Sequence, residues 1–133
     1  MVPPEIDWKK LLKTAGPYPL EAFQFVQQGL GHTVERVETY GGLAEGQGRH
    51  VSGQQLCLGL RDFAIQQYGL LAPTVLRSWN VVRTDDFGRI VFAMIEHGLM
   101  SKTSEDSLED FRGVYDFAEA FDREQILRQV RAS

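Results

Sequence analysis

Apolar side chains that recur every three or four residues constrain the fold of this 133-residue chain more than any other feature. That spacing places them on one face of a helix. Near the start of the chain it predicts a helix over residues 5–15, and Gly16-Pro17 is a typical helix end. The same spacing predicts a second, longer helix over residues 20–38. These two helices form an N-terminal pair over residues 5–38.

Two glycines stand inside the second predicted helix. Gly29 and Gly31 each cost about 1 kcal/mol relative to alanine in a helix interior. They either let a neighbouring helix pack closely or mark a break near His32. The sequence leaves both explanations open.

A glycine-rich segment, residues 39–51, separates this pair from the rest of the chain and is expected to be a loop. It lacks the GK[ST] and GxGxxG patterns of phosphate-binding loops. Ser52 and Gln55 then form the S-x-x-Q pattern of a capping box. This pattern, followed by apolar residues at helical spacing, predicts a helix over residues 53–68.

Two more helices are predicted in the centre of the chain. Pro73 suits the first turn of a short helix. Thr84 is the expected N-cap of the next helix, because Asp85 and Asp86 would then lie in the first turn and interact favourably with the helix dipole. Gly98 is the expected end of that helix.

The last third of the chain predicts a small element of β-structure. Residues 99–103 and the apolar run at 114–117 flank a polar turn, which is the pattern of a β-hairpin. A C-terminal helix is expected over 118–130. The predicted fold class is therefore α+β, mostly helical, with five to six helices and one hairpin in a single domain of residues 1–133. The helix-helix-helix-hairpin order over 52–117 resembles a winged helix.

Composition and charge limit the classes of function. The hydrophobic fraction of 43% and the charged fraction of 24% are typical of a globular protein. Neither a secretory signal nor an apolar run of about 18 residues occurs, so we expect a cytoplasmic protein without a membrane partner. The net charge of −4 and the isoelectric point of about 5.3 disfavour nucleic acid as a partner, because neutralising phosphates needs a basic face.

No pattern in the sequence predicts catalysis. The histidines His32, His50 and His97 are far apart and do not have the spacing of a metal site. The single cysteine, Cys57, is flanked by leucines and is expected in the core. No serine stands in a GxSxG pattern. We therefore expect no catalytic residue, no metal ligand, no cofactor and no enzymatic activity.

An acidic cluster stands between the two predicted strands: Glu105, Asp106, Glu109, Asp110 and Asp116. The spacing of its oxygen ligands and the absence of the required glycine do not fit a calcium-binding EF-hand loop. Paired carboxylates act in acid–base catalysis only when burial or close pairing shifts their pKa values. We therefore expect a solvated turn whose charges keep the hairpin tip soluble.

Four residues are candidates for an interaction surface: Phe25, Phe92, Arg83 and Arg89. Phe25 and Phe92 fall off the main apolar stripes of their predicted helices. Each marks either a second packed face, which we favour, or a surface that contacts a partner. Arg89 lies on the helix that would recognise nucleic acid in a winged helix, and Arg83 stands just before that helix.

The leading hypothesis is a non-enzymatic module that binds an unidentified protein partner, with a homodimer as a further assembly. A winged-helix-like regulator that binds nucleic acid is the first alternative. Clustering of four arginines on one face would favour it: Arg49, Arg77, Arg83 and Arg89. A small metal-dependent or small-molecule enzyme is the second alternative. A pocket shared by His50 or His97 with the carboxylates of Asp85 and Asp86 would favour it.

The chain also resembles a family of small bacterial proteins of unknown function, over about residues 5–121. The resemblance is carried by segments 50–53, 84–88, 90–92, 101–103, 110–111 and 115–117 and by Trp79. It implies a compact single domain. It implies no activity, cofactor or catalytic residue.

Overall fold

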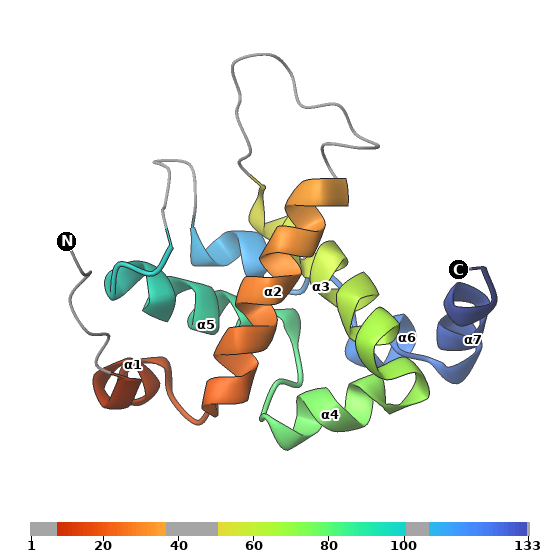
Figure 1. Cartoon of the computed structure of the whole chain (residues 1–133), viewed down its shortest axis with the longest axis horizontal. Coiled ribbons are helices and arrows are strands. Elements are labelled where there is room, and N and C mark those ends of the chain that lie inside the picture. Colours follow the sequence, from red (N-terminus) through yellow and green to blue (C-terminus); the bar gives the residue numbers. More distant parts are fainter. Residues whose placement is uncertain (1–7, 37–50, 101–106, 133) are drawn as a thin grey trace, which may run out of the picture.

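The computed structural model describes residues 8–36, 51–100 and 107–132, and every regular element in these ranges is a helix (Figure 1). In chain order they are α1 (Trp8–Ala15), α2 (Leu20–Arg36), α3 (Gly53–Tyr68), the 3₁₀ helix η2 (Gly69–Leu71), α4 (Ala72–Ser78), α5 (Thr84–Glu96), the 3₁₀ helix η3 (Leu108–Phe111), α6 (Phe117–Ala120) and α7 (Arg123–Ala132). The predicted loop over residues 39–50 lies outside the described residues.

Local capping signals set several helix ends as predicted. The capping box of α3 is confirmed: the Gln55 N–H donates to Ser52 Oγ at 3.1 Å, and the Ser52 N–H donates to Gln55 Oε1 at 2.9 Å. Gly98 follows α5 with a φ of +75°, a left-handed conformation that glycine adopts without strain.

Glycines bring α2 and α3 close together. A Cβ added at Gly29 would overlap the side chain of Leu60, and one added at Gly59 would overlap Thr33. Helix α2 runs unbroken past His32 to Arg36, so the glycines of α2 do not mark a break there. Close helix packing is therefore the reason for Gly29, whereas a Cβ at Gly31 would meet no neighbour within 4 Å.

Aromatic rings connect the helices in the core. Phe25 of α2 packs against Phe63 of α3, with ring centroids 5.4 Å apart, and against Trp79 at the end of α4, at 5.5 Å. Phe87 of α5 lies 6.0 Å from Phe117 of α6. Such tilted ring pairs add about 0.5–1.5 kcal/mol each to the free energy gained by burial.

The predicted β-hairpin and the α+β fold class are wrong, because the described residues contain no strand. The winged-helix arrangement is therefore also wrong, because the predicted hairpin was its wing. Instead of a hairpin turn, the chain forms η3, where the Ser107 N–H donates to the Asp110 carboxylate at 3.1 Å. Phe111 then packs where Gly88 leaves space, since a Cβ at Gly88 would lie 2.8 Å from the Cβ of Phe111. Residues 101–106 lie outside the described residues.

The apolar run at 114–117 also leads into helix rather than strand. The Asp116 carboxylate accepts a hydrogen bond from the Ala118 N–H at 2.9 Å and thereby caps α6. The single helix predicted over 118–130 is two helices, because the Asp122 carboxylate accepts from the Glu124 N–H at 3.2 Å at the start of α7. The acidic residues at these positions therefore cap helices and do not cover a hairpin tip.

Candidate functional site

Polar side chains at the start of α5 form a cluster whose hydrogen bonds are made within the protein. The Asp86 carboxylate is buried and accepts hydrogen bonds from the N–H groups of Val82, at 2.8 Å, and Arg83, at 3.1 Å. The hydroxyl of the buried Tyr18 also donates to this carboxylate. Asp86 therefore caps α5 and ties the segment before α2 to it. The predicted cap Thr84 is wrong by one residue, because Arg83 occupies the N-cap position.

Thr84 and Asp85 bind a distant part of the backbone instead. The buried Thr84 hydroxyl donates to the carbonyl oxygen of Phe111 at 2.7 Å and accepts from the N–H of Val114 at 3.0 Å. Asp85 accepts from the N–H of Gly113 at 3.2 Å. We call Tyr18, Thr84, Asp85 and Asp86 the α5 cap cluster. Its polar groups satisfy one another or the backbone, so its role is structural.

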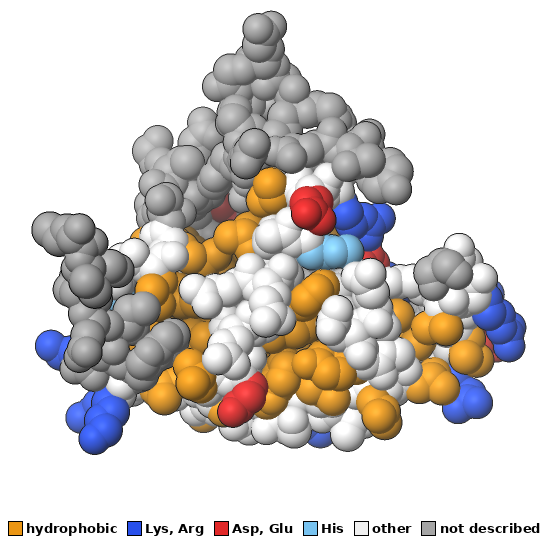
Figure 2. All heavy atoms as spheres, viewed as in Figure 1, with side chains coloured by type: hydrophobic (Ala, Val, Ile, Leu, Met, Phe, Trp, Pro, Cys, Tyr) orange, Lys and Arg blue, Asp and Glu red, His pale blue; other side chains and the backbone are white. Residues whose placement is uncertain are grey.

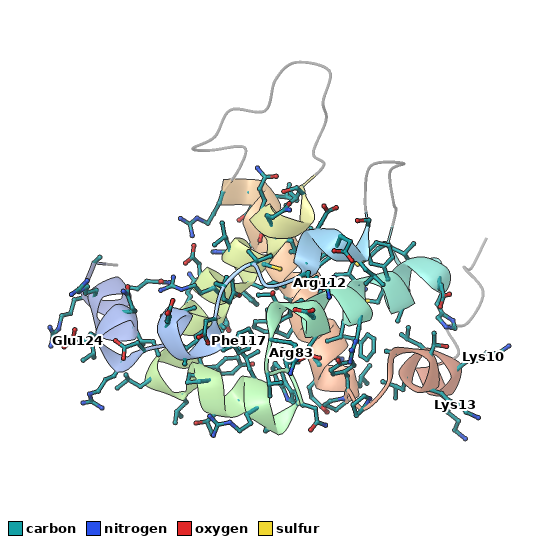
Figure 3. The ribbon with its side chains drawn as sticks, turned by 180° about the vertical axis from the view of Figure 1, so that it is seen from behind. Lys10, Lys13, Arg83, Arg112, Phe117 and Glu124 are labelled. Atoms are coloured by element: carbon teal, nitrogen blue, oxygen red, sulfur yellow. The ribbon has the colours of Figure 1, made fainter. Side chains whose placement is uncertain are left out.

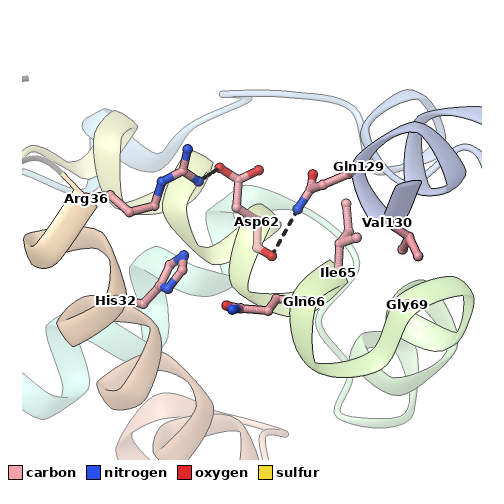
Figure 4. Close-up of a pocket in the computed structure, with 8 residues that line it drawn as sticks. All are labelled: His32, Arg36, Asp62, Ile65, Gln66, Gly69, Gln129 and Val130. Atoms are coloured by element: carbon pink, nitrogen blue, oxygen red, sulfur yellow. Dashed lines mark hydrogen bonds and ion pairs between the residues drawn. The ribbon is translucent and has the colours of Figure 1, made fainter. Parts of the chain in front are cut away.

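A pocket of about 660 Å³ lies between α2, α3 and α7 and is the candidate functional site (Figure 4). Its lining comes from the last turns of α2 and α3, from η2 and from α7: His32, Arg36, Asp62, Ile65, Gln66, Gly69, Gln129 and Val130. A volume of about 300–1,000 Å³ is typical of sites that bind small ligands. The mixture of polar and apolar lining is also typical of such sites.

Two arginines share one carboxylate at this pocket. Arg36 forms an ion pair with one oxygen of Asp62, and Arg61 Nη1 lies 3.0 Å from the other oxygen. The guanidinium of Arg61 is further held by the Ala120 carbonyl oxygen and the Gln129 side chain, each at 3.0 Å. We call Arg36, Arg61, Asp62 and Gln129 the pocket cluster. It carries one more positive than negative charge.

Arg36 and Arg61 differ in how firmly they are held. The Arg61 side chain is largely buried, whereas that of Arg36 is 47% exposed at the pocket edge. Among the described residues, Asp62 is the hydrogen-bond and ion-pair partner of Arg36. A guanidinium has five N–H donors, so most donors of Arg36 have no partner among the described residues.

His32 contributes an unsatisfied group to the pocket wall. Its ring packs against Phe63, with centroids 5.4 Å apart. Its Nε2 atom is buried and has no hydrogen-bond partner among the described residues. A buried polar atom without a partner costs about 1–3 kcal/mol. Because Nε2 is shielded from solvent, a ligand would contact it only after the ring turned.

Exposed apolar side chains stand in two of the elements that line the pocket, η2 and α7. Leu71 is 64% exposed, Leu70 43% and Val130 47%. We call these three residues the apolar rim. They belong to η2 and α7, which contact each other. Figure 2 shows hydrophobic side chains gathered over α3, α4 and α7, with basic side chains at the far end of α7.

The four sequence-predicted interaction residues do not form one surface. Phe25 is 3% exposed and packs in the core. Phe92 is half-buried, and its ring lies 6.2 Å from that of Phe111. Arg83 and Arg89 are exposed, and Arg89 Nη1 lies 3.9 Å from Asp86. Contact of Phe92, Arg83 or Arg89 with a partner stays a prediction.

Acidic side chains accompany the basic ones on the opposite face. Arg83 and Arg112 lie on the face seen in Figure 3, and Lys10 and Lys13 extend outward from α1 at its edge. Arg112 pairs with Glu109 at 3.4 Å. Arg77 is exposed, and Arg49 lies outside the described residues. This face is therefore not uniformly basic.

Of the groups named for an enzyme, His50 lies outside the described residues, and the other three do not converge. Asp85 and Asp86 belong to the α5 cap cluster, whereas His97, at the opposite end of α5, has its Nε2 3.3 Å from Thr14 Oγ1. Burial raises the pKa of Cys57 to about 12. Within the described ranges, no three His, Cys, Asp or Glu side chains are placed to share a metal ion.

Sequence reasoning missed the pocket because its members are distant in the chain. Arg36 and Asp62 are 26 residues apart, and Arg61 and Gln129 are 68 apart. The exposed Leu70-Leu71 pair after Gly69 was the one local signal of a surface apolar patch. No helix in the described part of the chain is long and apolar enough to cross a membrane.

Comparison with known proteins gives no matching family model, no similar curated protein and no similar solved structure. The resemblance to a bacterial family therefore stays a prediction.

Proposed function

We propose that this protein is a non-enzymatic interaction module that binds a segment of another protein at the pocket and the apolar rim. The observation that carries the proposal is the exposure of Val130, which lines a pocket with a charged edge, and of Leu70 and Leu71, which follow Gly69 of the same lining. Protein interfaces commonly combine an apolar centre with a polar border. Exposed apolar side chains that are contiguous are typical of such contact sites.

Charge complementarity indicates the chemistry of the partner. Helix α7 carries Arg123, Arg128 and Arg131 against one acidic residue, Glu124. Arg36 adds a half-exposed positive charge at the pocket edge. The occupant we propose is therefore a segment with apolar side chains flanked by acidic ones.

The net charge of −4 does not oppose this assignment. The described ranges contain equal numbers of basic and acidic side chains. The surplus of acids belongs to residues 1–7, 37–50 and 101–106. The helical body can therefore present a locally basic surface although the whole chain is acidic.

Two observations support a role without catalysis. The Cys57 thiol, whose pKa burial raises to about 12, stays protonated at neutral pH and is a poor nucleophile. The carboxylate of the pocket, Asp62, is already paired with two arginines. We retain the cytoplasm as the proposed location.

The test uses two matched leucine variants. Leu71→Asp places a charge in the apolar rim, and Leu58→Asp changes a leucine of α3 that is 52% exposed but outside the rim. Partners are captured from a nuclease-treated lysate of the source organism, identified, purified and titrated by calorimetry. We expect Leu71→Asp to weaken binding at least about tenfold and Leu58→Asp less than about twofold.

Both variants should keep the wild-type melting temperature, because both side chains are exposed. Equal binding of a purified partner to wild type and Leu71→Asp would overturn the proposal. Capture that occurs from an untreated lysate but is lost after nuclease treatment would also overturn it. A homodimer that Leu71→Asp dissociates would replace the external partner with a second copy of this chain.

A further inference from the structure

We propose that the pocket between α2, α3 and α7 is a subsite for an acidic side chain of the docked segment, and that Arg36 is the residue that contacts its carboxylate. This inference rests on the proposed function. It adds that the module recognises an acidic side chain of its partner. The supporting observations are the charge balance of the pocket cluster, the exposure of Arg36 and the lining of the pocket.

The charge balance favours a second carboxylate. Arg36 and Arg61 both pair with Asp62, so two positive charges face one negative charge. Arg61 is held by the Ala120 carbonyl and by Gln129 in addition, and it compensates Asp62 when Arg36 turns to a ligand. A carboxylate of the partner would then complete two guanidinium–carboxylate pairs.

The exposure of Arg36 keeps the cost of this exchange small. Ion pairs between exposed side chains contribute about 0–1 kcal/mol, because water competes for both groups. Arg36 is 47% exposed, so turning part of its guanidinium toward a ligand sacrifices little. A ligand carboxylate can accept two parallel N–H bonds from one guanidinium, which is the stronger geometry.

The rest of the lining fits a side chain better than a free anion. Ile65 is buried in the pocket wall, and Gly69 presents no side chain there. These groups can contact the methylene groups of an aspartate or glutamate. Gln66 is exposed and lines the same pocket, and a glutamine amide can donate to a carboxylate oxygen. Leu71 and Val130 of the apolar rim would contact the neighbouring apolar residues.

The test selects ligands without knowledge of the natural partner. Random linear peptides are displayed with the C-terminus fused to the carrier, so that a carboxylate comes from a side chain only. We expect the peptides enriched by the wild-type protein to carry an aspartate or glutamate beside apolar residues. An enriched peptide and its Asp→Asn or Glu→Gln version are then synthesised and titrated by fluorescence polarisation.

A double-mutant cycle with Arg36→Gln separates contact from general attraction. We expect Arg36→Gln to weaken the acidic peptide at least about tenfold and the amide peptide less than about twofold. Arg112→Gln is the control, because Arg112 is an exposed arginine on the opposite face, outside the pocket lining. It should change the binding of both peptides by less than about twofold.

The outcomes distinguish this inference from the proposed function. If peptides lose binding to Leu71→Asp but bind Arg36→Gln as well as wild type, the acidic subsite is wrong and the interaction module stands. If no enriched peptide depends on Leu71, the proposed function is wrong at this surface. If the effects of Arg36→Gln and of the amide peptide add independently, Arg36 does not contact the carboxylate.

Discussion

The α5 cap cluster and the pocket cluster both join distant parts of the chain through polar side chains, yet they differ in what they leave unsatisfied. In the α5 cap cluster, the Asp86 carboxylate accepts three hydrogen bonds and is buried. In the pocket cluster, Arg36 is half-exposed, and Asp62 is its partner among the described residues. A closed polar cluster holds the fold, whereas an open one is available for binding.

Asp86→Ala should give the largest loss of stability. It removes the cap of α5 and leaves the N–H groups of Val82 and Arg83 and the Tyr18 hydroxyl without their acceptor. We expect the free energy of unfolding to fall by about 3 kcal/mol, as measured by urea denaturation. Asp62→Ala in the pocket cluster should cost about 1 kcal/mol. Equal losses would contradict the distinction between closed and open clusters.

Thr84→Val should cause the second-largest loss of stability. Valine preserves the shape of the side chain but leaves the Phe111 carbonyl and the Val114 N–H without a partner. We expect a loss of about 2 kcal/mol in the free energy of unfolding, because unpaired buried polar groups cost about 1–3 kcal/mol each. Thr74→Val, at an exposed position of α4, is the control and should change stability by less than about 0.5 kcal/mol.

The Tyr18 hydroxyl should make stability depend on alkaline pH. Burial, and then the hydrogen bond to Asp86, raise the pKa of Tyr18 from 10.0 to about 12. Between pH 10 and pH 12 the unfolded tyrosine loses its proton while the folded one keeps it, so stability falls as the pH rises. We expect this fall to amount to about 2 kcal/mol.

Tyr18→Phe should reduce the alkaline fall, as measured by urea denaturation at several pH values. The raised pKa of Cys57, which burial shifts from 9.0 to about 12, has the same sign and remains in the variant. A wild-type slope in Tyr18→Phe would show that the hydroxyl is not held in the closed cluster as described.

Arg36→Gln should have the smallest effect on stability. Its ion pair with Asp62 is half-exposed, so we expect a change within about 0.5 kcal/mol in urea denaturation. A loss above about 1 kcal/mol would mean that the pocket cluster is structural. The comparison between the two clusters would then no longer identify a binding site.

The helices were predictable where their signals are local. The capping box of Ser52 and Gln55 acts within four residues, and the glycine conformation after α5 depends on one residue. The hairpin prediction failed because residues 111–114 are held by hydrogen bonds from a distant part of the chain, and the run at 114–117 leads into α6. The decisive hydrogen bonds to residues 111–114 come from Thr84 and Asp85, 27 to 30 residues earlier.

The candidate site was less predictable than the fold for the same reason. The charges of Arg36, Arg61 and Asp62 are common on helix surfaces, and nothing in their spacing indicates that they meet. Phe25 is the opposite case, because its position in the sequence did give a signal. Its position off the apolar stripe indicated a second packed face or a partner surface, and the ring lies in the core among four other aromatic rings.

Local unfolding of α7 would remove one wall of the pocket. The helix supplies Gln129 and Val130 to the pocket wall, but Ile126 is its one buried residue among those described. A helix held by so little buried surface should open more often than α3, and its amide hydrogens should exchange with solvent faster. A ligand that binds only when α7 is folded would slow that exchange. Amide protection in α7 would then report occupancy of a pocket whose ligand is still unidentified.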